Sequence, residues 1–111
     1  MTRQPVELLQ GTLDMLILKA VSGEPMHGFG IARWIEGVTS QRLSVEEGAL
    51  YPALHRMEKK GWLASRWEMT ANKRRAKYYE ITPSGRDELA LQVQRWDGSA
   101  SAVYQVLRAA E

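Results

Sequence analysis

The chain of 111 residues contains no cysteine and only two histidines, His27 and His55. The lack of cysteine excludes disulfide bonds and thiolate metal sites. With only two histidines, we do not expect a zinc or copper site built from this chain. We therefore expect no metal and no cofactor, and a regulator that senses metals through thiolates is disfavoured.

Long apolar runs are also lacking. No stretch reaches the roughly 20 residues that cross a bilayer, and polar side chains interrupt the first apolar cluster, unlike a secretory signal. No pairing of a nucleophile with a base and no phosphate-binding loop is evident. We expect a cytoplasmic protein that has no membrane contact and is not an enzyme.

Positive charge is concentrated in the middle of the chain. The net charge is +2, but residues 1–40 carry −1, residues 41–79 carry +5 and residues 80–111 carry −2. A basic segment on a nearly neutral chain indicates a polyanionic partner. The alternative is a basic surface that is merely solvated.

Apolar residues at helical spacing predict three helices in the first half of the chain. The first covers residues 10–22 and the second covers residues 28–37, with Ile31 and Ile35 facing inward. Ser44 and Glu47 have the spacing of a capping box, so the third helix should start just after Ser44. It should run to about residue 60 and end at Gly61.

The second half predicts a hairpin followed by one long helix. Aromatic and β-branched residues in 62–68 and 76–82 predict two strands with a polar, basic tip between them. Thr82 and Pro83 suit the N-cap and first position of a helix that runs nearly to the C-terminus. The fold class is therefore mainly α with a small β-hairpin. We expect a winged helix-turn-helix in residues 1–82 and a long C-terminal dimerisation helix in residues 83–111.

The third helix has a second face that its core does not require. Gly48 costs a helix roughly 1 kcal/mol relative to alanine, and Pro52 removes a main-chain hydrogen bond. Such residues let the backbone approach a DNA groove, where Tyr51 and His55 can bond phosphates or base edges. The alternative is that Tyr51 packs beneath the hairpin and His55 is solvated. The inward stripe should comprise Leu50, Ala53, Leu54 and Met57.

The hairpin tip gathers like charges that repel one another, so stability does not require them. Beside duplex DNA they would release counterions and anchor the backbone. The alternative is a solvated turn. The candidate DNA-binding residues are Ser44, Glu47, Gly48, Tyr51, Pro52, His55 and Lys59 from the third helix and Lys73, Arg74, Arg75 and Lys77 from the hairpin.

Three blocks of the chain resemble the signature blocks of PadR-type transcriptional regulators. They are "LLQGTLDMLILKAVSGEPMHGFGIARWIE", "LSVEEGALYPALHRMEKKGWL" and "RRAKYYEITPSGRDEL", and the resemblance covers residues 8–89. It implies a dimeric winged-helix protein, in most members a repressor, that often releases DNA when a small molecule binds. Operators of this type suggest an ATGT…ACAT inverted repeat.

The resemblance also assigns roles to residues. It implies base contacts near Gly48, Tyr51, Pro52 and His55, and backbone contacts from Lys73, Arg74 and Arg75. The chain departs from the family where His27 and Phe29 replace frequent tyrosines, and where the hairpin tip lacks a frequent glycine.

The last helix carries an apolar seam at alternating spacings of four and three residues. A helix over residues 83–110 would be about 42 Å long, whereas the preceding residues form a globule of about 30 Å. The seam should therefore meet a second chain, with the first helix as docking surface; the alternative is that it folds back as core. The seam residues are Leu89, Val93, Trp96, Ala100, Val103 and Leu107.

Trp96 lies at the centre of this seam, near the small Ala100. Two such indoles could form a slot for a planar aromatic effector, and the neighbouring Asp97 favours a cationic one. The alternative is an interface tryptophan without a ligand. The rival function is a winged-helix module that binds protein instead of DNA, and salt-sensitive duplex binding would distinguish the two.

Overall fold

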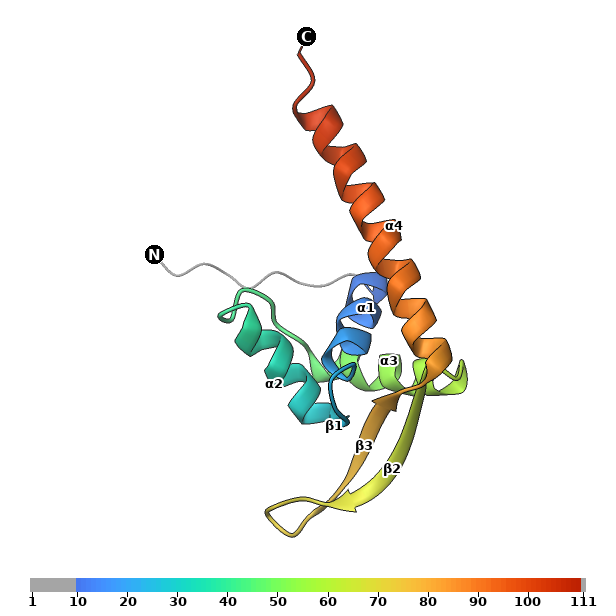
Figure 1. Ribbon diagram of the computed structural model, residues 1–111. Helices are drawn as coiled ribbons and strands as arrows, with labels where there is room; N and C mark the ends of the chain where they lie inside the picture. The colour runs from blue at the N-terminus through green and yellow to red at the C-terminus, as the bar shows by residue number, and fades with distance from the viewer. Residues whose placement is uncertain (1–9, 111) are drawn as a thin grey trace.

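The computed structural model describes residues 10–110, so Leu8 and Leu9 of the first signature block lie outside it. Within this range the chain forms four helices and three strands (Figure 1). No helix among the described residues is both long and apolar enough to cross a membrane. The elements are α1 (Gln10–Ala20), β1 (Met26–His27), α2 (Gly28–Val38), α3 (Glu47–Lys59), β2 (Leu63–Met69), β3 (Arg75–Ile81) and α4 (Pro83–Leu107).

The first three helices enclose the core, as their apolar spacing predicts. Ile17 of α1, Ile31 of α2 and Leu54 of α3 are completely buried. The buried carboxylate of Asp14 forms an ion pair with Arg56 and so joins α1 to α3. The predicted inward stripe of α3 is confirmed, because each of its four members is buried.

The sheet has three strands and not the predicted two. β1 pairs with β3 through Met26 opposite Tyr79 and His27 opposite Tyr78, giving the order β1-β3-β2. The prediction missed β1 because a strand of two residues is too short to show an alternating pattern. Its place depends on contact with a segment about 50 residues away in the chain.

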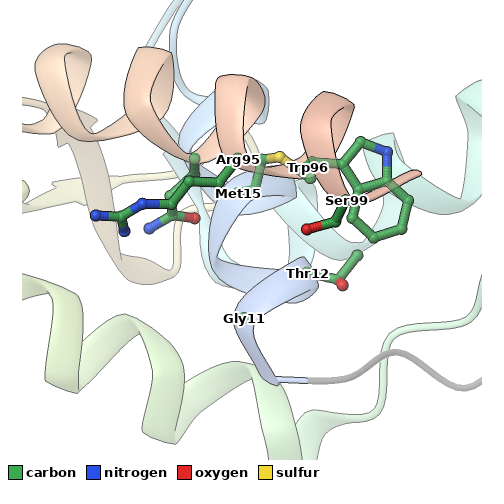
Figure 2. Close-up of a pocket in the computed structure, with 7 residues that line it drawn as sticks. Gly11, Thr12, Met15, Arg95, Trp96 and Ser99 are labelled. Atoms are coloured by element: carbon green, nitrogen blue, oxygen red, sulfur yellow. The ribbon is translucent and has the colours of Figure 1, made fainter. Parts of the chain in front are cut away.

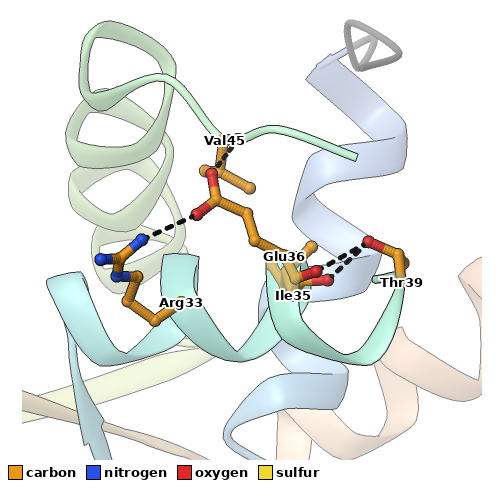
Figure 3. Close-up of polar contacts among 5 residues, drawn as sticks. All are labelled: Arg33, Ile35, Glu36, Thr39 and Val45. Atoms are coloured by element: carbon orange, nitrogen blue, oxygen red, sulfur yellow. Dashed lines mark hydrogen bonds and ion pairs between the residues drawn. The ribbon is translucent and has the colours of Figure 1, made fainter. Parts of the chain in front are cut away.

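The predicted capping box of Ser44 and Glu47 is wrong. Glu46 is the N-cap of α3, without a side-chain cap bond, and the helix begins at Glu47. The segment before α3 is held by α2 (Figure 3): the backbone N–H of Val45 donates to Glu36 Oε2 over 3.0 Å. This bond holds the segment before the helix, which begins at Glu47, three residues after Ser44.

The start of α4 is confirmed at Thr82 and Pro83. The Thr82 hydroxyl accepts a hydrogen bond from the Gly85 backbone N–H at 3.0 Å and donates one to the Gly61 carbonyl at 2.6 Å. Gly85 lies so close to the chain after α3 that a Cβ atom would be 2.1 Å from the Trp62 carbonyl oxygen. This contact docks α4 on the core, and from there the helix continues unbroken through Gly98 and projects away from it (Figure 1).

Candidate nucleic-acid interface

The outer face of α3 is exposed along its whole length. Ser44 is half-buried before the helix begins. The candidate residues on the helix are all exposed: Glu47, Gly48, Tyr51, Pro52, His55 and Lys59. The helix continues through Pro52. One face of α3 therefore belongs to the core and the other is free to meet a partner.

Tyr51 is exposed and also held in place. Its side chain is 46% exposed, but one side of the ring lies against Gly28, the first residue of α2. A Cβ atom on Gly28 would come within 2.8 Å of Tyr51 Cε1, so any larger residue there would push the ring away. The absence of a side chain at position 28 thus sets the direction in which Tyr51 presents its ring.

His27 belongs to the scaffold, whereas His55 is exposed on α3. His27 is the N-cap of α2, and its Nδ1 accepts a hydrogen bond from the Gly30 backbone N–H at 2.9 Å. Its ring also meets the edge of Tyr78, with 5.4 Å between the centroids. His27, which stands where the family often has a tyrosine, therefore caps the N-terminus of α2.

The middle of the hairpin is fastened to the C-terminal half of α3. Glu58 accepts a hydrogen bond from the Ser65 hydroxyl and lies 3.1 Å from the Lys77 ammonium. The Ser65 bond, followed by Lys77, lowers the pKa of Glu58 below its ordinary value of 4.5 even though burial opposes the shift. The same contact raises the pKa of Lys77. Lys77 is thus an anchor between α3 and the hairpin and does not lie at the tip.

The tip holds the other three basic candidates in solvent. Lys73, Arg74 and Arg75 are all exposed. The turn is closed by hydrogen bonds from Thr70 N–H to the Arg74 carbonyl at 2.8 Å and from Lys73 N–H to the Thr70 carbonyl at 2.9 Å. Lys73 takes the left-handed conformation, with φ of 61°, which glycine adopts without strain. The tip therefore forms a defined turn without glycine.

The two faces of the hairpin differ in charge. On the face away from α3, Arg66 forms ion pairs with Glu68 at 3.3 Å and Glu80 at 3.4 Å, which balance its charge. On the other face, Arg75 lies with its guanidinium 5.1 Å from the centroid of the Trp67 ring. Positive charge is therefore concentrated on the face that also meets α3.

The sequence prediction did not include Trp67 and Met69 among the functional residues. Both are more than half exposed on the face of β2 that carries Ser65. The side-chain alternation of β2 places Trp67 and Met69 on the same face as Ser65. The available signal was the basic cluster that follows these residues in the chain.

The second half of α4 leaves the predicted seam without a cover in this chain. Leu89 packs against the core, but Trp96 is 51% exposed and Leu107 is 71% exposed. The alternative that the seam packs into the core of its own chain therefore holds for Leu89 and is wrong for the seam residues that follow it. The other seam residues, Val93, Val103 and Ala100, are exposed or half-buried.

A cavity of about 430 Å³ lies between α1 and α4, beside Trp96 (Figure 2). Arg95 lines this cavity and Asp97 does not. The predicted slot between two Trp96 rings requires a second chain and stays a prediction. The lining residues are Gly11, Thr12, Met15, Gln92, Arg95, Trp96 and Ser99.

Three packed helices, an exposed face on the third and a hairpin fastened beside it define a winged helix-turn-helix protein. The model of the transcriptional regulator PadR-like family matches residues 17–91. The chain belongs to this family of transcriptional regulators.

Solved structures support the same assignment. A transcriptional regulator from Clostridium thermocellum is 27% identical, with a TM-score of 0.80 over 86% of this chain and 93% of that one. A PadR family regulator from Eggerthella lenta is 30% identical, with a TM-score of 0.76 over 91% of this chain and 86% of that one. A PadR-like regulator from Bacillus cereus is 27% identical, with a TM-score of 0.76 over 92% of this chain and 97% of that one.

Proposed function

We propose that the protein is a dimeric transcriptional repressor that binds an inverted-repeat operator, with ATGT…ACAT as the expected element. The observation that carries this proposal is the exposed outer face of α3 beside a hairpin with a basic tip. Two chains related by a two-fold axis present two such faces, and an inverted repeat offers two equivalent half-sites to them.

The residues of α3 supply sequence recognition in this proposal. Gly48 and Pro52 let the helix backbone approach the major groove, since neither projects a long side chain. Tyr51 and His55 lie one turn apart and contact base edges or the adjoining phosphates. Glu47 and Lys59 contact the duplex near the two ends of the helix, and Ser44 contacts it before the helix begins.

The hairpin supplies contacts to the backbone. Lys73, Arg74 and Arg75 neutralise phosphates, which gives affinity that does not depend on sequence. Lys77 supports them indirectly by holding the hairpin against Glu58. Residues 1–82 thus form the DNA-binding unit and residues 83–111 the dimerisation unit.

The seam of α4 forms the dimer interface. Its exposed apolar residues lie on a helix that extends past the core, where only a second chain can cover them. The partner's seam and α1 are the surfaces that meet it. This arrangement fixes the distance between the two reading helices.

A planar aromatic effector binds beside Trp96 and lowers operator affinity. The indole supplies a stacking surface, worth about 0.5–1.5 kcal/mol beyond burial. Arg95 favours a ligand with an acidic group, and Gln92 Oε1 has no hydrogen-bond partner among the described residues and could accept one from the ligand. A ligand here would contact both α1 and the seam of α4. It would therefore change the distance between the two α3 helices that read the half-sites.

Selection of bound duplexes from a random pool tests this function. The selected duplex should contain an inverted repeat, and the dimer should prefer it to random duplex at physiological salt. Replacing Lys73, Arg74 and Arg75 with alanine should weaken binding to all duplexes alike. The slope of log affinity against log salt concentration should fall by roughly 5. Replacing Tyr51 or His55 should instead lower discrimination at a contacted base pair by about 1–3 kcal/mol. Equal binding of selected and random duplex would refute the proposal.

A further inference from the structure

Two large apolar side chains stand exposed on the hairpin. Trp67 is 59% exposed and Met69 is 63% exposed. Because side chains alternate along a strand, both lie on the face of β2 that carries Ser65, which bonds to α3. Burying this pair in the protein core would stabilise the fold, and leaving it in water does not. The pair is therefore suited to a contact outside the chain.

Basic side chains frame this apolar pair. Met69 is paired with Arg75 across the hairpin, and Trp67 is paired with Lys77. The Arg75 guanidinium lies over the Trp67 ring, 5.1 Å from its centroid, in a cation–π contact. The stack holds an apolar surface and a positive charge together as one unit. The opposite face has no such unit, because Arg66 is paired there with two carboxylates.

This charge and this position favour duplex DNA as the partner. The hairpin extends away from the core beyond α3 (Figure 1), so a duplex whose major groove holds α3 would bring an adjacent minor groove toward it. Proteins that enter the minor groove combine arginines with apolar wedges, among them methionine and phenylalanine, which partly unstack a base step. Trp67, Met69 and Arg75 are such a set.

We propose that Trp67 and Met69 form an apolar wedge that enters the minor groove beside each half-site, with Arg75 held against the groove by the Trp67 ring. This inference rests on the proposed function. The wedge opens a base step, so affinity depends on how easily the DNA deforms there, although no side chain reads those bases. Pyrimidine–purine steps deform most easily. The hairpin therefore adds a preference for a TA or CA step in the flank.

The test compares two duplexes that carry the same selected operator and differ only in the flanking step, TA in one and AA in the other. Wild-type protein should bind the TA duplex about tenfold more tightly and bend it more, as measured by energy transfer between dyes at the duplex ends. Trp67→Ala and Met69→Ala should each lose most of this preference and of the bend. For Met69→Ala the salt slope should not change, because the side chain is uncharged and the Trp67–Arg75 stack stays in place.

Two control variants isolate the wedge. Arg66→Ala removes a positive charge from the opposite face of the hairpin and should keep the flank preference. Trp67→Phe retains an aromatic ring and should keep most of it. Met69→Ala leaves the Trp67–Arg75 stack intact, so it tests the wedge even if Trp67→Ala loosens the hairpin; circular dichroism reports the folding of each variant.

The outcomes separate this inference from the proposed function. If both alanine variants keep the flank preference and the bend while the half-site preference persists, the wedge is refuted and the proposed function stands. If Met69→Ala lowers the salt slope, the loss comes from a displaced cation, and the apolar wedge is refuted. If the wild type prefers no half-site over random duplex, both proposals fail.

Discussion

The two ends of α4 belong to one helix but have opposite surroundings. Near its start, Gly85 is buried against the backbone of Trp62, and Leu89 packs on the core. Further along, Trp96 and Leu107 are more than half exposed, although the same apolar spacing continues through them. The first end completes the fold of one chain. The second carries an apolar stripe that needs another surface to cover it.

This difference separates two tasks in the proposed mechanism. The docked end of α4 holds the winged helix together, so changes there should act on folding. The projecting end should act on dimerisation and on the spacing of the two DNA-binding units. Substitutions at matched positions of the same helix can test whether the tasks are separate.

Deleting the residues after Gln94 should have the largest effect. The deletion keeps Gly85 and Leu89 in place but removes the seam from Trp96 onward. We expect a folded monomer whose operator affinity is lower by about 10²- to 10⁴-fold, because two half-sites are no longer bound together. Sedimentation and operator titration measure both changes. A truncated chain that remains a dimer would show that α1 alone suffices for association.

Gly85→Ala should be the most damaging single substitution in α4. The new Cβ would be 2.1 Å from the Trp62 carbonyl oxygen and 2.9 Å from Ile81, so the helix must shift from its dock. We expect a loss of about 3 kcal/mol in the free energy of unfolding, measured in urea.

Gly98→Ala is the matched control in the projecting half. A Cβ there meets nothing within 4 Å in this chain, so the change should stabilise the helix by about 0.5–1 kcal/mol. A loss of unfolding free energy for Gly85→Ala and a gain for Gly98→Ala would support the contrast between the two ends of α4. Destabilisation at Gly98 would show that another surface lies against that side of α4.

Asp14→Asn measures how much the buried ion pair between α1 and α3 contributes to the stability of the winged helix. The change removes the charge that pairs with Arg56 between α1 and α3. Because the Arg56 side chain is 28% exposed, water compensates in part, and the expected cost is about 1–2 kcal/mol of unfolding free energy. Asp87→Asn on the exposed surface of α4 is the control and should cost less than about 0.5 kcal/mol. Equal effects at the two positions would mean that the ion pair adds nothing.

The smallest expected effect is the contribution of Glu58 to the loss of stability at acid pH. Its pKa lies below 4.5 in the folded chain, because Ser65 and Lys77 favour the carboxylate. This contribution to stability is therefore complete above about pH 4.5 and is lost as the pH falls through the lowered pKa. Glu58→Gln should cost less than about 1 kcal/mol at neutral pH and flatten the acid dependence of Tm. An unaltered acid dependence would contradict the anchor.

The local patterns of the sequence were sufficient for most of the fold. The helical spacing of apolar residues, the Thr82–Pro83 start of α4 and the stop at Gly61 are properties of short segments, and the structure confirms them. The capping box at Ser44 failed because a distant carboxylate, Glu36, competes for the same stretch of backbone. β1 was missed because a strand of two residues is too short to show the alternation of apolar and polar residues.

The candidate site divides in the same way. The sequence alone determined which residues of α3 face outward and where the basic tip lies, since periodicity and composition decide both. Only the tertiary structure decided that Gly28 directs Tyr51, that Arg75 stacks on Trp67, and that Arg95 lines the cavity beside Trp96. The first two depend on contacts between different elements, and the third on how α4 is rotated against α1. No local pattern in the sequence encodes these arrangements.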